Sequence, residues 1–162
     1  MRGVVALAAA RPAQIPAPTF SRNIILTLFR HDRLMANPAP IDLSVFSVST
    51  DFNAGLIYYK MTKLWDRETY RLYHEAMVLE MSRFRNLGRS FCLIGDLTEF
   101  PPQPQDLNDM RAELVVVARS MGMRKCAVVY ANSIVKMQLG RLSEQAYAFF
   151  TSEKDALAWI NE

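Results

Sequence analysis

The sequence predicts an α/β protein in which helices pack on a mostly parallel sheet of about five strands. From residue 43 onward, short apolar runs typical of strands alternate with longer segments whose apolar residues recur every three or four positions, as in amphipathic helices. The first two runs follow each other directly, whereas predicted helices separate the later ones. The predicted order is therefore β-β-α-β-α-β-α-β-α, and strands joined through helices lie parallel in one sheet.

The composition is that of one soluble globular domain, with 162 residues, 51% of them hydrophobic and 22% charged. No apolar run approaches the roughly 18 residues that span a bilayer. Residues 1–42 hold five arginines and two aspartates, which account for the whole net charge of +3, so the rest of the chain is neutral. Because nucleic-acid binders concentrate positive charge on their folded surface, we expect no nucleic-acid partner.

Residues 1–42 are expected to be a disordered or poorly structured N-terminal extension, because five prolines interrupt them and no apolar period persists. Met1 and Arg2, followed by the small and apolar residues 4–10, resemble a very short signal peptide. Two alternatives are a disordered tail and an extension translated from too early a start codon, in which case Met35 begins the protein. We expect the folded domain at 43–162.

Both cysteines, Cys92 and Cys126, fall in predicted buried strands, where a free thiol packs as a small hydrophobic group. We therefore expect reduced thiols and a cytoplasmic protein. Neighbouring strands can bring two thiols together, so a redox role stays open.

The folded domain begins with a predicted hairpin. Residues 43–50 alternate apolar side chains with serine or threonine, which is typical of a half-buried strand. Residues 56–62 form a second strand, rich in β-branched and aromatic side chains. Asn53 and Gly55 lie between the two strands and tolerate the positive φ of a turn.

The longest predicted helix begins after Asp66, a favourable N-cap, and ends at Gly88. Its apolar residues recur at spacings of three and four and share one face. They are Tyr70, Tyr73, Met77, Met81 and Phe84. His74 on this helix has only His31 as a second histidine in the chain, so no zinc site is predicted.

A buried strand from Phe91 to Ile94 comes next, and Asp96 stands where this strand would end. In open α/β sheets the functional crevice lies at the carboxyl ends of the strands. The loop that follows, residues 96–106, is rich in proline and acidic side chains, and Asp106 is the predicted N-cap of the next helix. We expect any functional surface to lie here.

The remaining segments alternate between strand and helix. Residues 125–130 and 146–150 are predicted strands, and a helix from 133 to 144 lies between them. Ser152 and Asp155 form a capping box for the terminal helix. The apolar contacts of the helix at 133–144 are expected to be Ile134, Met137 and Leu142.

Catalytic motifs are absent from the sequence. It contains no phosphate-binding Gly-x-x-x-x-Gly-Lys loop, no Gly-x-Gly-x-x-Gly turn after a strand and no Gly-x-Ser-x-Gly elbow. We therefore expect a protein that is not an enzyme, with no cofactor and no metal.

Three segments carry a family resemblance: 126–130, 137–142 and 149–160. The last of them, an aromatic strand followed by a capped helix that ends Ala-Leu-Ala-Trp-Ile, is the most specific. Together they resemble the STAS-like family of sulfate-transporter domains and anti-sigma factor antagonists. The resemblance is greatest to its small bacterial members, which are similar to the sporulation antagonists (SpoIIAA-like) and to lipid-transfer domains. It spans about residues 43–162 and implies the STAS-like order of strands and helices.

In the antagonist branch, the loop after the central strand begins Asp-Ser-Ser-Gly, and a partner kinase phosphorylates the first serine. Leu97 stands at the position of that serine here, which leaves Thr98 as the candidate for phosphorylation. The resemblance implies a regulatory module that binds a protein partner through the loop 96–106 and the following helix. The partner-binding residues that we expect are Asp96, Leu97, Thr98, Glu99, Phe100 and Asp106.

A second hypothesis is a protein that binds a small hydrophobic, lipid-like molecule. Several methionines lie on the predicted helix faces, among them Met77, Met81 and Met110, and their flexible side chains leave room for an apolar pocket against the sheet. The lipid-transfer side of the resemblance implies the same chemistry. An enclosed apolar cavity would favour this hypothesis, and an exposed patch around the loop would favour a protein partner.

Overall fold

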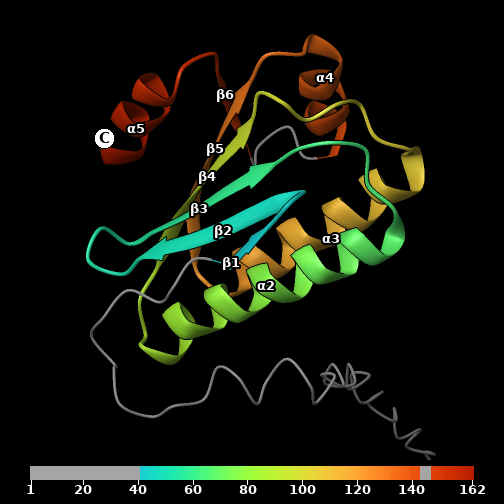
Figure 1. The fold of residues 1–162 in the computed structure, drawn as a ribbon. Helices are drawn as coiled ribbons and strands as arrows, with labels where there is room; N and C mark the ends of the chain where they lie inside the picture. Colours follow the sequence, from blue (N-terminus) through green and yellow to red (C-terminus); the bar gives the residue numbers. More distant parts are fainter. Residues whose placement is uncertain (1–40, 143–146) are drawn as a thin grey trace, which may run out of the picture. The chain divides into compact units, whose positions relative to one another are not determined.

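The computed structural model describes residues 41–142 and 147–162 (Figure 1). The first 40 residues of the expected N-terminal extension, with the segment that resembles a signal peptide and the alternative start at Met35, lie outside this part of the chain. The described elements are β1 (Ile41–Leu43), β2 (Phe46–Asp51), β3 (Leu56–Met61), α2 (Arg67–Asn86), β4 (Phe91–Leu97), α3 (Gln105–Ser120), β5 (Met123–Tyr130), α4 (Ser133–Leu142), β6 (Ala148–Phe150) and α5 (Glu153–Asn161).

The strands form one sheet in which their spatial order follows the sequence. β1 with β2 and β2 with β3 pair antiparallel, whereas β3–β4, β4–β5 and β5–β6 pair parallel. The predicted α/β class with a mostly parallel sheet is thereby confirmed. The segment 43–50, predicted as one strand, is divided by a turn at Ser44 and Val45, and Leu43 pairs back onto Phe46. The described sheet therefore has six strands instead of about five.

Helices lie on both faces of the sheet (Figure 1). α2 and α3 run side by side over one face, where their apolar side chains and those of α4 join one large core cluster. α5 lies on the other face and packs over β4, β5 and β6, where Ala156 and Ile160 enter a smaller cluster. Much of β2 and β3 on this second face is thus left without a covering helix from the described chain.

Two predicted N-caps are confirmed by their hydrogen bonds. The Asp66 carboxylate accepts a bond of 2.7 Å from the Thr69 amide at the start of α2. Ser152 Oγ accepts a bond of 3.2 Å from the Asp155 amide at the start of α5. Both caps satisfy amide groups that have no partner within the helix.

Asp106 was expected to cap α3, and this prediction is wrong. The helix already begins at Gln105, and Pro104 occupies the N-cap position without a side-chain hydrogen bond. Asp106 instead lies in the first turn, where its carboxylate forms an ion pair of 3.0 Å with Arg67. The ring of Pro104 fixes φ at −56°, a value compatible with the start of a helix, and α3 begins two residues earlier than an N-cap at Asp106 would place it.

The predicted inner face of α4 is also wrong. Val135 and Leu139 are buried in the core, whereas Ile134 and Met137 are about half exposed. Val135 and Leu139 are separated by four positions and therefore share one face of the helix. Ile134 and Met137 lie beside that face, and their apolar character alone did not indicate which side of a short helix meets the sheet.

Cys92 and Cys126 are free, buried thiols on adjacent strands. The register pairs Cys92 with Lys125 and Leu93 with Cys126, so the two cysteines occupy positions of opposite parity. Cys92 consequently belongs to the cluster beneath α5, and Cys126 to the cluster beneath α2 and α3. The sheet itself separates the two sulfur atoms.

Candidate functional site

The candidate site lies where β3 and β4 end side by side. Lys60 and Asp96 are direct neighbours in the parallel register of these strands, and both side chains point to the face that carries α5. Lys60 Nζ lies 3.5 Å from Asp96 Oδ2 and 2.7 Å from Glu99 Oε1. A single cation therefore joins the end of β4 to the loop that follows.

Asp96 also holds the first turn of that loop. Its Oδ1 accepts hydrogen bonds from the Thr98 amide at 3.0 Å and from the Thr98 hydroxyl at 2.6 Å. Partial burial favours the neutral carboxyl, but the Thr98 hydrogen bonds and the charge of Lys60 outweigh this effect and lower the pKa of Asp96. The hydrogen bond to Glu99 and the nearby Asp96 raise the pKa of Lys60. Asp96 and Lys60 are therefore both charged at neutral pH.

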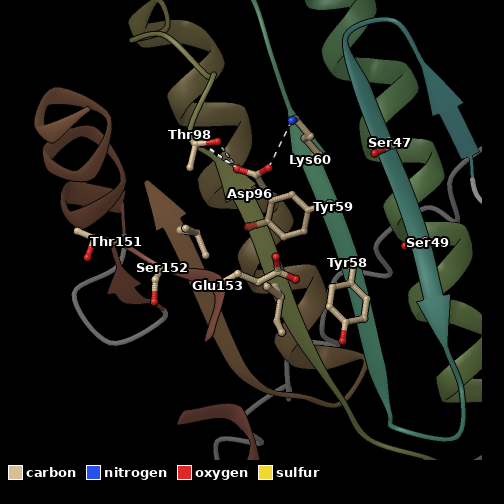
Figure 2. Close-up of a pocket in the computed structure, with 12 residues that line it drawn as sticks. Ser47, Ser49, Tyr58, Tyr59, Lys60, Asp96, Thr98, Thr151, Ser152 and Glu153 are labelled. Carbon is tan, nitrogen blue, oxygen red and sulfur yellow. Dashed lines mark hydrogen bonds and ion pairs between the residues drawn. The ribbon is translucent and has the colours of Figure 1, made fainter. Parts of the chain in front are cut away.

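A pocket of about 380 Å³ adjoins this charged group (Figure 2). It lies between the uncovered part of β2 and β3, the end of β4 and the start of α5. Alternation along β2 buries Phe46, Val48 and Thr50 and turns Ser47 and Ser49 toward the pocket. Hydroxyl groups dominate the lining, and the side chains that carry them on this face are Ser47, Ser49, Tyr58, Thr98, Thr151 and Ser152.

The potential of the pocket is acidic. Asp96 and Glu153 line it, and Glu99 stands beside it, against the single cation Lys60 among the lining residues. The same field acts on Tyr58, whose pKa is raised first by burial and then by the charges of Asp51 and Glu153. The arrangement is suited to binding hydroxyl, amide or basic groups.

The structure brings together three of the six residues that were expected to bind a partner. The partly buried Asp96 and the exposed Thr98 and Glu99 form one group at the end of β4. Leu97 and Phe100, in contrast, are 0% and 2% exposed and therefore do not offer their side chains to a partner. Leu97 is the last residue of β4, so its side chain points into the large core rather than into the loop.

Phe100 and Asp106 have other roles. The Phe100 ring packs edge-on against Trp65, with 5.2 Å between the ring centroids, and anchors the loop to the segment before α2. Asp106 pairs with Arg67 on α2 instead of joining the Asp96 group.

The proline-rich loop is further fixed by Gln103, a residue that the sequence did not single out. Its side chain accepts a hydrogen bond from the Trp65 amide at 3.0 Å and donates to the Lys63 carbonyl at 3.2 Å and to the Pro101 carbonyl at 2.9 Å. The side chain of Gln138 on α4 accepts a hydrogen bond from the Gln103 amide at 3.1 Å and donates one to the Gln103 carbonyl at 2.9 Å. The loop is therefore held as one rigid unit.

Sequence reasoning also missed Lys60, Tyr58 and Glu153 as residues of the site. Lys60 lies in a strand otherwise rich in apolar and aromatic residues, and Glu153 belongs to a segment more than 50 residues after Asp96. A usable signal does exist in β2, where serines at positions 47 and 49 alternate with buried residues and predict a polar face.

The space between the sheet and the Met-rich helices is much smaller than the lipid hypothesis needs. The cavity there, lined by Met77, Met81 and Tyr73 among others, measures about 30 Å³. Ligand pockets for small organic molecules measure roughly 300–1,000 Å³. This cavity has room for one or two water molecules or a small ion, but not for a lipid chain.

In residues 41–142 and 147–162, no group of three or more histidine, cysteine, aspartate or glutamate side chains is placed to hold a metal ion. None of the helices in the same part of the chain is long and apolar enough to cross a membrane.

Comparison with known proteins rests on the fold. No family model matches the chain, and no curated protein matches it. A solved structure that is similar is that of an uncharacterized protein of the DUF3478 family, with a SpoIIAA-like fold, from Shewanella loihica PV-4. The TM-score is 0.53 at 13% sequence identity, and the match covers 75% of this chain and 98% of that one.

The chain has a SpoIIAA-like fold. This agrees with the STAS-like resemblance of its C-terminal segments and with the order of its strands and helices. At 13% identity the likeness concerns the fold alone.

Proposed function

We propose that this protein is a regulatory module without catalytic activity that binds a protein partner through the surface formed by Lys60, Asp96, Thr98 and Glu99, hereafter the β4-end surface, and through the adjoining pocket. The observation that carries the proposal is the exposed, hydrogen-bonded charge group at the carboxyl ends of two parallel strands. In open α/β sheets, this is the edge at which ligands and partners bind.

Rigidity supports the proposal. The turn after β4 is fixed by Asp96, and the proline-rich segment behind it is fixed by Gln103 and by the buried Phe100. A surface that is already ordered before binding loses less conformational entropy when a partner docks, so the same contacts give a higher affinity.

The charge of the site indicates the chemistry of the partner. Lys60 is shared between Asp96 and Glu99, and Glu153 lines the opposite side of the pocket. Three carboxylates against one ammonium group leave an excess of negative charge. A partner segment that places an arginine or lysine side chain into the hydroxyl-lined pocket therefore complements this surface.

A partner-capture experiment tests the proposal. Wild-type protein and two charge-reversed variants, Glu99→Lys and Glu113→Lys, are used to recover partners from the native cells. Both variants change the net charge equally, but Glu113 is an exposed residue of α3 outside the pocket lining. A partner that Glu113→Lys retains and Glu99→Lys loses supports the β4-end surface. A partner that binds both variants as it binds the wild type rules this surface out.

Filling the pocket separates its contribution from that of the charges. Ser49 lies on β2 and lines the pocket at a distance in sequence from the Asp96 group. We expect Ser49→Trp to weaken binding of the same partner while leaving the fold intact, because the residue is only partly buried. Unchanged binding would limit the contact to the β4-end surface alone.

Thr98 stays the candidate for phosphorylation within this proposal. Its hydroxyl is exposed but donates to Asp96 at 2.6 Å, so a phosphoryl group would replace that donor with a dianion next to two carboxylates. We expect phosphorylation to open the turn after β4 and to change the affinity for the partner. The intact mass of protein from native cells, compared with that of the Thr98→Ala variant, detects the modification directly.

A further inference from the structure

Arg111 on α3 is a buried cation without a carboxylate partner among the described residues. Its side chain is only 7% exposed. Its contacts are the sulfur of Met61, 3.7 Å from Nη2, and the ring of Phe100, whose centroid lies 5.2 Å from Cζ. Neither neutralises a full positive charge, and an uncompensated buried charge is costly. A negative charge beside the guanidinium would therefore stabilise the folded protein.

The 30 Å³ cavity between the sheet and the helices α2 and α3 lies beside this guanidinium, because Arg111 is one of its lining residues. Tyr73 lines the same cavity, is 3% exposed, and has a hydroxyl that makes no hydrogen bond within the described chain. The neighbouring Tyr70 differs, since its hydroxyl donates to the Met110 carbonyl at 2.7 Å. Two buried polar side chains thus face one small cavity without protein partners that match them.

The remaining polar groups of the cavity can also donate hydrogen bonds. The Tyr59 hydroxyl and the Cys126 thiol lie 3.9 Å apart at the sheet, and Tyr147 is a half-buried lining residue with a further hydroxyl. No acidic side chain lines the cavity. A guanidinium together with phenol and thiol donors forms a set that matches an anion, which accepts hydrogen bonds and carries the missing charge.

We propose that this cavity is a binding site for one small inorganic anion of halide size, held by Arg111 and Tyr73. The cavity is large enough for such an ion, since a single water needs only about 10–15 Å³. A water molecule would fill the space but would leave the Arg111 charge uncompensated.

The field of Arg111 reaches the other groups of the site. Burial raises the pKa of Tyr73 and of Cys126, and the charge of Arg111 acts against this rise in both. Arg111 also lies over the ring of Phe100, which anchors the loop behind the β4-end surface. A bound anion that holds Arg111 in place therefore helps to hold that loop.

The first test measures thermal unfolding of the wild type at constant ionic strength while sodium gluconate is exchanged for sodium chloride or sodium bromide. We expect the unfolding midpoint to rise with the logarithm of the halide concentration once this exceeds the dissociation constant, because only the folded state holds the site. A flat response overturns the proposal.

Variants separate the buried site from general salt effects. Arg111→Met keeps much of the side-chain length without the charge and should lose the halide response. Arg67→Met removes an exposed arginine and should keep it. Tyr73→Phe removes one hydrogen-bond donor to the bound anion and should raise the dissociation constant for the halide about tenfold or more. An equal halide response in Arg111→Met and the wild type overturns the proposal.

Location is tested on wild-type crystals soaked in sodium bromide, so this result does not depend on a variant that folds. We expect an anomalous bromide peak in the cavity, within hydrogen-bond distance of Arg111 and Tyr73. Bromide found only on the outer surface, with water in the cavity, contradicts the proposal.

Discussion

The ring of Tyr59 on β3 occupies the space that a side chain at Gly95 on β4 would need. The two residues are neighbours in the parallel register, and a Cβ atom on Gly95 would lie 2.3 Å from Cζ of Tyr59. No real Cβ atom tolerates such a distance. Gly95 therefore lets the Tyr59 ring lie flat against the strand, directly before Asp96, and reach Cys126 with its hydroxyl.

We expect Gly95→Ala to destabilise the protein by about 1–3 kcal/mol, because the added methyl group overpacks a core that cannot yield. Urea denaturation measures this loss. Gly140→Ala on α4 is the matched control: its Cβ would meet nothing within 4 Å, and alanine favours a helix by about 1 kcal/mol, so stability should rise. In a Tyr59→Ala background, Gly95→Ala should cost little, and an equal cost in both backgrounds would contradict the contact.

The observed starts of α2 and α3 predict that substitutions of Asp66 and Asp106 lower the stability by unequal amounts. Asp66→Ala removes a true N-cap of α2 and should cost about 1 kcal/mol in the free energy of unfolding. Asp106→Ala should cost less, because Asp106 lies in the first turn of α3 and contributes only an exposed ion pair and a dipole interaction. Denaturant unfolding of the two variants under the same conditions checks the order, and a larger loss for Asp106→Ala would contradict the observed helix start.

Glu80 predicts a pH-dependent stability. It is 3% exposed, and burial raises its pKa above the ordinary value, although Arg83 and a hydrogen bond of 2.9 Å from Thr50 act against this. The folded state therefore binds the proton more tightly than the unfolded state, and this stabilisation is complete below about pH 4.5 and is lost as the pH rises through the folded pKa.

Glu80→Gln should accordingly be more stable than the wild type at neutral pH, and the difference should shrink toward zero as the pH falls to about 4. Urea denaturation at a series of pH values measures this convergence. Glu113→Gln, which changes an exposed carboxylate of α3, serves as the control and should show no such trend. A constant difference for Glu80→Gln across the pH range would show that ionisation of Glu80 is not its cause.

The cysteines should be inert in the folded protein. Burial raises the pKa of Cys126 to about 12, and Cys92 is 0% exposed on the opposite face of the sheet. With a pKa near 12, only about one Cys126 thiol in ten thousand is ionised at pH 8. We expect iodoacetamide to label both cysteines in urea and neither in buffer, as read by intact mass. A Cys92–Cys126 disulfide formed in the folded protein by a thiol oxidant would contradict the arrangement.

Local signals predicted much of this fold. The caps Asp66 and Ser152 each accept a hydrogen bond from an amide group three residues away, so a few adjacent residues contain the whole interaction. The buried strand predicted from Phe91 to Ile94 could also be recognised, because both faces of β4 are covered there and these four side chains are continuously apolar.

The predictions were wrong where contacts between residues distant in the sequence determine the position of a side chain. Leu97 was assigned to the loop because Asp96 interrupts the apolar run, yet pairing with Tyr130 on β5 extends β4 to Leu97 and turns its side chain inward. Phe100 was expected on the surface of an acidic loop, and its burial depends on Trp65, 35 residues earlier. Lys60, the cation that organises the site, meets Asp96 only through the parallel register of β3 and β4.

The lengths of β1 and β6 have a consequence for the way in which this protein can be recognised. Each outer strand of the described sheet has three residues, so each of these two strands offers few free backbone amide and carbonyl groups. Short edge strands oppose the addition of a strand from another chain. A partner that docks by extending the sheet would gain little, and the fold instead directs recognition to side chains at the ends of its central strands.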